Sequence, residues 1–243
     1  RDPALQLHRR RHQGAEVMEE GDLLALFRRR VDDTAAQPLY EDAQVYDFLN
    51  DAVRQAALRK RLLLDNSTAE VCVYAVDGLT EGYATVTLHS RVLAVRSARW
   101  SGSTTPLHLT TLKVMDKDRP DWTSATASIP THLVVDRESG KIDLWPAPEL
   151  DGTLTLAVWR LPLEAEACES ESDEPVVDEV FHVDLIDWME HLAYLQKDSE
   201  QNDLQRSAAA EARFTNKFGR LPSAREIKLW GIAPPRGQRA QFV

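Results

Sequence analysis

Apolar residues recur at steps of three or four between Pro175 and Gly219, which predicts two helices joined by an acidic turn at 198–203. The first helix carries apolar residues on two sides, so it is expected to pack against neighbours on both. Its two ridges are Phe181, Leu185, Trp188, Leu192 and Leu195, and Ile186, Met189 and Ala193. The second helix has one apolar face, made by Leu204, Ala208, Phe214 and Phe218. Gly219 and Pro222 predict its end.

Two helices are also predicted near the amino terminus. The first follows Asp22, a possible N-cap, and has Leu23, Leu24, Phe27 and Val31 on one face. The second starts at Asp42, also a possible cap, and closes at 65–67. Its apolar face consists of Val45, Phe48, Leu49, Ala52, Val53 and Ala56. The bases of its second half suit the negative end of the helix dipole, and we interpret them as a solvated face: Arg54, Arg59, Lys60 and Arg61.

The middle of the chain changes to short β-branched and alternating runs, which predict strands. The expected strands are Thr68–Val76, Tyr83–Leu88, Val92–Trp100, His132–Asp136, Lys141–Trp145 and Thr153–Arg160. A short helix is expected at Thr110–Lys117. Most of these strands follow one another without a helix between them, which indicates an antiparallel sheet or a small barrel.

The predicted fold class is therefore α+β, with helix pairs at both ends of the chain forming one bundle around an inserted antiparallel β-sheet or barrel. Residues 1–20 are polar and lack a period, and are either a mobile arm or an arm that orders on a neighbouring subunit. The expected parts are a flexible amino-terminal arm at 1–20, a helical bundle at 21–66 and 176–219, an inserted β-domain at 67–163, an acidic linker at 164–175 and a C-terminal docking tail at 220–243.

Charge is unevenly distributed along the chain. The net charge of −10 argues against a general nucleic-acid binder, which usually carries a basic excess. Residues 164–203 hold fourteen acids and one base, whereas 213–243 hold seven bases and one acid. This asymmetry suggests that the two segments meet different partners or environments.

The two cysteines, Cys72 and Cys168, provide no disulfide framework, so a reducing compartment is expected. Apolar runs fall short of the roughly 20 residues that a membrane span needs, so no membrane partner is expected. The basic amino terminus lacks the apolar core of a signal peptide, and secretion is not indicated.

Catalytic motifs are missing from the sequence: it has no phosphate-binding glycine loop, zinc-protease motif, paired cysteine motif or nucleophile elbow. Glu179 and His182 have the spacing of di-iron ligands, with Asp187 and His191 further along the same helix. Such a site needs a second matching motif, and the other helix pair offers none. We therefore expect no catalytic residue, no metal site and no cofactor. The tryptophans Trp145, Trp159 and Trp188 are assigned to core packing.

Four stretches carry a resemblance to a known family: Tyr40–Ala57, Lys141–Leu163 with its LWPAP sequence, Asp173–Asp198 and Glu211–Gly219. In this order they resemble the phage head-to-tail adaptor, or connector, proteins, and are similar to tail tubular protein A of short-tailed phages. The resemblance covers roughly residues 20–220.

The resemblance implies a structural virion protein that forms a ring, usually dodecameric, in the neck between portal and tail. It would extend the DNA channel and assemble in the host cytoplasm. The implied partners are further copies of the chain, the portal protein, tail or nozzle proteins, and genomic DNA that passes without specific binding. The residues expected to pack subunits together are Phe181, Trp188 and Leu192. Those expected to dock on the portal are Arg225, Lys228, Trp230, Arg236, Arg239 and Phe242.

Two other functions stay open at this point. One is a soluble regulatory protein whose β-region binds a ligand or a partner, without any role in a virion. The other is a metal-dependent enzyme built on Glu179, His182, Asp187 and His191.

Overall fold

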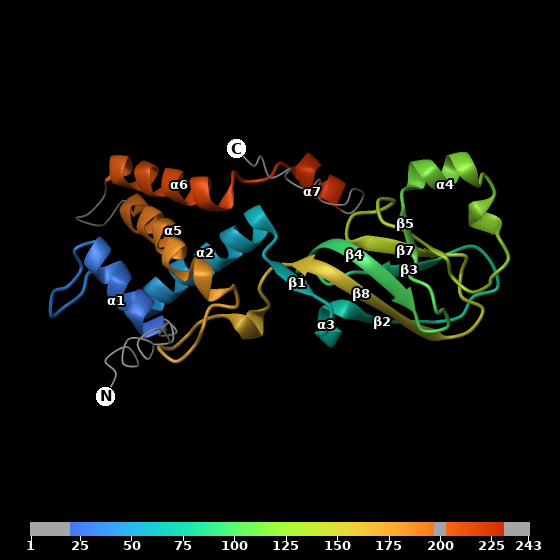
Figure 1. The fold of residues 1–243 in the computed structure, drawn as a ribbon, viewed down its shortest axis with the longest axis horizontal. Helices are drawn as coiled ribbons and strands as arrows, with labels where there is room; N and C mark the ends of the chain where they lie inside the picture. The colour runs from blue at the N-terminus through green and yellow to red at the C-terminus, as the bar shows by residue number, and fades with distance from the viewer. Residues whose placement is uncertain (1–19, 197–202, 231–243) are drawn as a thin grey trace, which may run out of the picture.

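The computed structural model describes residues 20–196 and 203–230 as an elongated molecule with its four long helices at one end and its strands, accompanied by short helices, at the other (Figure 1). The chain runs from helices into strands and back to helices, which confirms the predicted α+β class. The main helices are α1 (Glu20–Arg30), α2 (Asp42–Lys60), α5 (His182–Leu195) and α6 (Leu204–Phe218).

The four main helices share one hydrophobic cluster. Helix α5 contacts α1, α2 and α6, because it carries apolar residues on more than one side. Tyr40, from the connection between α1 and α2, is buried in this cluster, and its hydroxyl donates to the carbonyl oxygen of Ala193 over 3.0 Å. The amino-terminal helices are thereby joined to the end of α5 by both apolar contact and a hydrogen bond.

The boundaries of α2 differ from the prediction. The helix ends at Lys60, because Arg61 adopts a left-handed conformation with φ of 51°. Strand β1 (Leu63–Asp65) follows and pairs with a strand from much later in the chain, so the predicted close at 65–67 comes too late, and its first residue, Asp65, is already in a strand. At the other end, Asp42 is the first helical residue and not the cap; Glu41 precedes it without a capping side-chain hydrogen bond.

Two four-stranded sheets form the other end of the molecule. In the first, β8 (Gly152–Arg160) pairs antiparallel with β1 and β2 (Val73–Val76) and with β4 (Val92–Trp100). In the second, the order is β3 (Ala84–Thr87), β7 (Lys141–Trp145), β6 (His132–Val134) and β5 (His108–Thr110). Apolar residues from both sheets share a second hydrophobic cluster.

The predicted barrel is wrong for the described strands, which form two open sheets. The expected antiparallel pairing is found between the other paired strands that the structure describes, whereas β5 and β6 are parallel. Helix α4 (Leu112–Asp118) and the short helix η2 (Trp122–Ser124) lie between these two strands in the chain and supply the crossover that parallel pairing needs. Helix α3 (Ala69–Cys72) also replaces the first half of the strand predicted at 68–76.

The acidic linker is only partly exposed. It contains the short helix η3 (Glu164–Glu166) and leads to η4 (Glu179–Phe181). Between them Cys168 and Val177 are buried in the cluster of the helical end. The side-chain amide of Asn50 on α2 pairs with Cys168 in both directions, donating to its carbonyl and accepting from its N–H, each over 2.9 Å. The linker is therefore anchored to α2 by its backbone.

Beyond α6, helix α7 (Ala224–Trp230) contacts β4 (Figure 1). The predicted amino-terminal arm and the end of the tail at 231–243 lie outside the described residues, apart from Glu20, which begins α1. Among the described helices, none combines the length and the apolar character that crossing a bilayer requires.

Candidate interaction site

Three consecutive bases at the end of α2 lie over aromatic rings from three other parts of the chain. The guanidinium carbon of Arg59 is 4.6 Å from the ring centre of Trp188 and 5.1 Å from that of Phe214. Arg59 also donates to the hydroxyl of Thr215 over 3.1 Å, which fixes its position. Burial lowers the pKa of Arg59, while the carboxylates of Glu211 and Asp51 oppose this shift. This contact joins α2 to both α5 and α6.

Lys60 and Arg61, the next two bases, also lie over aromatic rings. The ammonium of Lys60 lies 5.3 Å from the ring of Phe181 and donates to the carbonyl oxygen of Lys217 over 3.1 Å. The guanidinium of Arg61 lies 5.0 Å from the ring of Trp230. Cation–π contacts of this kind contribute about 0.5–1 kcal/mol at exposed sites and more when desolvated. The last residues of α2 and Arg61 therefore contact both the helical cluster and α7.

The residues predicted to pack subunits together lie largely inside the chain's own helical cluster. Trp188 is buried, and its indole N–H donates to Asp51 over 2.7 Å. Phe181 and Leu192 are half-buried against the same cluster. Their assignment to contacts between copies stays a prediction, which depends on the parts of Phe181 and Leu192 that remain exposed.

Of the residues predicted to dock on the portal, two have described side chains. Trp230 is half-buried under Arg61, and Arg225 is exposed on α7. Lys228 belongs to α7, but its side chain lies outside the described set, as do all of Arg236, Arg239 and Phe242. The portal contact therefore stays a prediction.

Helix α7 has its own start signal. Ser223 and Glu226 form a capping box, in which Glu226 N–H donates to the Ser223 hydroxyl over 3.3 Å and Ser223 N–H donates to the Glu226 carboxylate over 2.8 Å. Arg220 pairs with the same carboxylate. Hydrogen bonds from Ser223 and Arg220 lower the pKa of Glu226 to about 2. The helix is thus defined locally by its own sequence.

The residues with di-iron spacing have other partners. Asp187 accepts from Arg30 over 2.8 Å and from Arg213 over 2.9 Å, which ties α5 to α1 and α6. His191 is bonded to the Ser207 hydroxyl over 2.9 Å, and Nε2 of the buried His182 lies 2.9 Å from the carbonyl of Val177. Within residues 20–196 and 203–230, no three His, Cys, Asp or Glu side chains are grouped as metal ligands would be.

A buried ion cluster lies where the helices meet the sheets. Arg160, at the end of β8, donates to Asp65 over 2.7 Å and to both carboxylate oxygens of Glu166 over 2.6 Å. Asp65 also accepts from the backbone N–H groups of Ser67 and Thr68. Although burial raises the pKa of Asp65, these hydrogen bonds outweigh it and hold that pKa far below its usual range.

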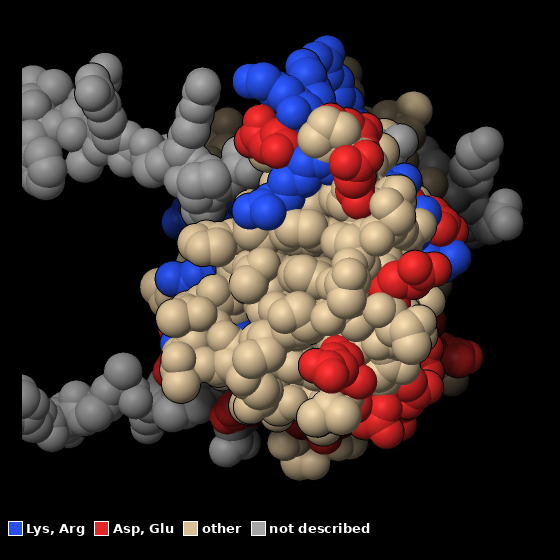
Figure 2. Space-filling model, turned by 90° about the vertical axis from the view of Figure 1, so that its right-hand side faces the viewer, with Lys and Arg blue, Asp and Glu red and all other residues tan. Residues whose placement is uncertain are grey.

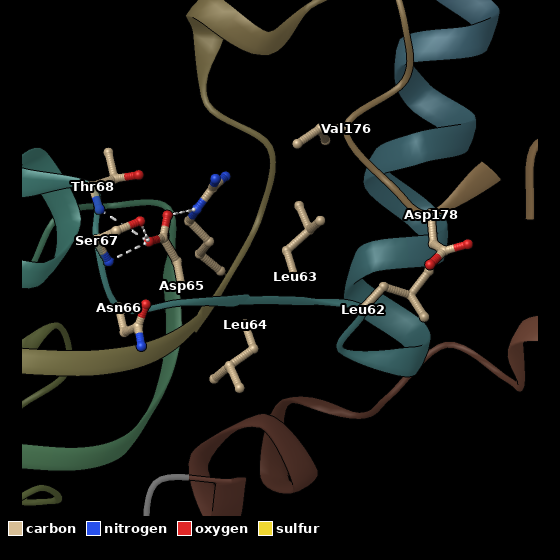
Figure 3. Close-up of a pocket in the computed structure, with 10 residues that line it drawn as sticks. Leu62, Leu63, Leu64, Asp65, Asn66, Ser67, Thr68, Val176 and Asp178 are labelled. Atoms are coloured by element: carbon tan, nitrogen blue, oxygen red, sulfur yellow. Dashed lines mark hydrogen bonds and ion pairs between the residues drawn. The ribbon is translucent and has the colours of Figure 1, made fainter. Parts of the chain in front are cut away.

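The ion cluster lines a hollow of about 390 Å³ (Figure 3). Its walls come from residues 62–68, Arg160, Val176 and Asp178, so they include both the first strand and the acidic linker. Figure 3 shows Asp65 and its donors turned toward one another, with Leu63 pointing into the space between β1 and the linker. Because the ionic groups satisfy one another, the cluster holds β1, β8 and the acidic linker together at this junction.

The profile of the SU10 adaptor protein family matches residues 18–238, which takes in both groups of helices and both sheets. The chain belongs to the SU10 adaptor protein family. This adaptor is therefore a structural phage protein, and the resemblance to phage adaptors seen in the sequence is confirmed at the level of the family. No curated protein matches the sequence.

Several contacts of this adaptor have no signal in its sequence. The bases at the end of α2 were interpreted as a solvated face, yet they cover rings from much later in the chain, from Phe181 to Trp230. The partners of Asp65 are similar: Ser67, Thr68 and Cys72 are local, while Arg160 lies 95 residues away. In the sequence, a charged residue at the end of a predicted helix or strand indicates that an ionic or cation–π contact can form there. Only the fold identifies the partner in that contact.

Proposed function

We propose that the protein is a head-to-tail adaptor that forms a ring between the portal and the tail and extends the DNA channel. The observation that carries this proposal is the match to the SU10 adaptor family over residues 18–238. In the finer form proposed here the ring is dodecameric, lies in the virion neck, assembles in the host cytoplasm and serves the role of tail tubular protein A in short-tailed phages.

The charge of the chain supports a channel that lets DNA pass. A net charge of −10 disfavours contacts with phosphates, so DNA can move through such a ring without being held. Several of the bases are also engaged within the chain, as Arg30 and Arg213 are with Asp187. A purified ring whose channel wall is basic would contradict this part of the proposal.

The portal contact is assigned to the segment after α6, which is rich in bases and apolar residues. In this segment α7 starts at its own capping box, and its attachment to the rest of the chain includes Arg61 and β4. An element with few attachments can be exchanged for a partner surface at low cost. We propose that Arg225, Lys228, Trp230 and the residues up to Phe242 contact the portal.

Co-expression with the portal protein of the same phage tests the proposal. We expect the two proteins to copurify and to give ring-shaped particles with rotational symmetry in negative-stain images. Removal of residues 221–243 should leave a folded protein that no longer copurifies, with circular dichroism as the folding control. Copurification without rings would limit the function to portal binding, and the absence of both would contradict the adaptor role.

A further inference from the structure

Three aliphatic side chains are exposed on neighbouring loops at the end of the β-region that faces away from the helices. Leu79, Ile129 and Leu150 expose 43%, 58% and 76% of their surface. Backbone hydrogen bonds of 2.7 and 2.9 Å hold the loops together, from Leu79 to Pro148 and from Ser128 to Ala147. We call these three side chains the loop patch. Figure 2 shows this end of the molecule, where the centre of the face is largely free of charged residues.

Acids border the loop patch. Asp77, Glu81, Glu149 and Asp151 are all exposed on the same loops, and within the described part of the chain none of them forms an ion pair. An uncharged centre with a polar border is the usual anatomy of a protein interface. The complementary surface is therefore apolar with a basic border. Two loop patches facing each other would bring like charges together, which costs binding energy.

The chain itself carries such a complementary surface beside the end of α2. Lys60 and Arg220, the latter ion-paired with Glu226, are exposed there next to Arg61, and Leu64 and Leu221 expose 41% and 54% of their surface. The hydrogen bond from Lys60 to Lys217 brings the end of α2 beside the segment that carries Arg220 and Leu221. We call these five residues the α2-end surface. Figure 3 shows Leu64 pointing away from the buried ion cluster, toward this side.

We propose that the loop patch of one copy docks on the α2-end surface of the next copy. The charge complementarity of the two surfaces and the exposed aliphatic residues at the centre of each support this partner. The contact joins two different surfaces, so it leaves one of each free at the ends of any chain of copies, and repetition yields a closed ring or a filament. This inference rests on the proposed ring and names the surfaces that build it.

Cross-linking between two single-cysteine variants tests the contact. Both native cysteines, Cys72 and Cys168, are buried, so introduced thiols on the surface are the reactive ones. A mixture of Leu150→Cys and Leu221→Cys, treated with a short bismaleimide, should give a 150–221 dimer in large excess over 150–150 and 221–221 dimers. Val114→Cys, on α4 and 45% exposed, is the control and should cross-link at least about tenfold less with Leu221→Cys.

Charge exchange provides an independent second measurement. Glu81→Lys with Glu149→Lys, and separately Lys60→Glu with Arg220→Glu, should each raise the concentration of half-assembly at least about tenfold, because like charges then face each other. An equal mixture of the two variants should restore assembly, since a contact between the two different variants again joins opposite charges. Circular dichroism spectra equal to those of the wild type establish that the variants are folded.

The outcomes separate this contact from the proposed function. A ring with the portal but no preferred 150–221 cross-link, or dimers dominated by 150–150, would overturn the contact and leave the adaptor role intact. Variants that assemble like the wild type, or a mixture that stays dissociated, would overturn it as well. If the wild type forms no ring even with the portal, the proposed ring fails, whatever the cross-links between free copies show.

Discussion

The guanidinium of Arg61 lies 5.0 Å from the ring centre of Trp230, so the end of α7 is held against the end of α2. Arg61 can reach this ring because its left-handed conformation, with φ of 51°, turns the chain sharply after Lys60. The same residue therefore ends a helix, leads into β1 and contacts the segment that precedes the proposed portal contact. Its side chain is the natural place to alter the attachment of α7 without touching the core.

Replacement of Arg61 by alanine should loosen α7. A cation–π contact contributes about 0.5–1 kcal/mol at such a site, so amide exchange in 224–230 should accelerate by about two- to fivefold in hydrogen-exchange mass spectrometry. Arg225→Ala is the matched control, because Arg225 is exposed on the same helix. Equal exchange in both variants would mean that Arg61 does not hold α7 in place.

Loss of Arg160 should be among the most damaging changes at a charged residue. Arg160→Met leaves Asp65 buried without its ionic partner, which costs about 3–5 kcal/mol in the free energy of unfolding measured with denaturant. Adding Asp65→Asn should recover part of that loss, because the uncompensated charge is removed. The exposed pair between Arg54 and Asp51 is the control, and Arg54→Met should cost less than about 1 kcal/mol.

The pairing of β5 with β6 should weaken in mild acid. His132 lies opposite His108, with ring centres 5.5 Å apart, and beside Trp145 at 5.4 Å, while its Nδ1 is 2.8 Å from the Thr131 hydroxyl. Burial lowers the pKa of His132 most, and the charges of Arg119 and His108 lower it further. The folded protein therefore takes up this proton less readily than the unfolded chain.

Because the pKa of His132 is lower in the folded protein than in the unfolded chain, acid destabilises the fold. The contribution of neutral His132 to stability is complete above its ordinary pKa of about 6.5 and declines as the pH falls below that value toward the lowered folded-state pKa. Thermal unfolding between pH 7.5 and pH 5 should show this decline, and His132→Gln should reduce it. A variant with an unchanged pH dependence would assign the decline to other groups.

Trp188 offers a direct test of core packing against subunit packing. Its ring lies 5.1 Å from that of Phe214 and is buried, so Trp188→Ala should cost about 3–5 kcal/mol in the stability of the isolated chain. Trp188→Phe should cost less, since it keeps most of the apolar volume and loses the hydrogen bond to Asp51. Full monomer stability of Trp188→Ala together with lost ring formation would place Trp188 at a contact between copies.

Elements with a long and clear period were predictable from the sequence. Strands β4 and β7 have the predicted bounds, and the apolar face predicted for α2 is the face that it buries. Short elements were not predictable in the same way. Strands β1 and β5 have three residues each, and they are strands only because β8 and β6 pair with them. A three-residue run carries too little periodicity to indicate such distant pairing.

The candidate site was predictable in its residues but not in its contacts. Trp188 was assigned to packing and Trp230 to portal docking, yet the sequence could not identify Arg59 and Arg61 as the bases that cover their rings. Buried Trp145 agrees with its assignment to core packing, whereas Trp159 is only half-buried. Side-chain contacts between distant segments depend on the angles at which the helices cross. The spacing of apolar residues along the sequence does not predict these angles.

Strands β1 and β8 are hydrogen-bonded neighbours at the place where the chain enters and leaves the β-region, with Leu63 opposite Arg160. The sheets are thus attached to the helices by two covalent connections that lie side by side and are joined by a ladder. A single linker would let the sheets swivel, whereas paired connections resist both twisting and sliding. A force applied at the far loops would therefore reach the helical end through two hydrogen-bonded strands and not through one.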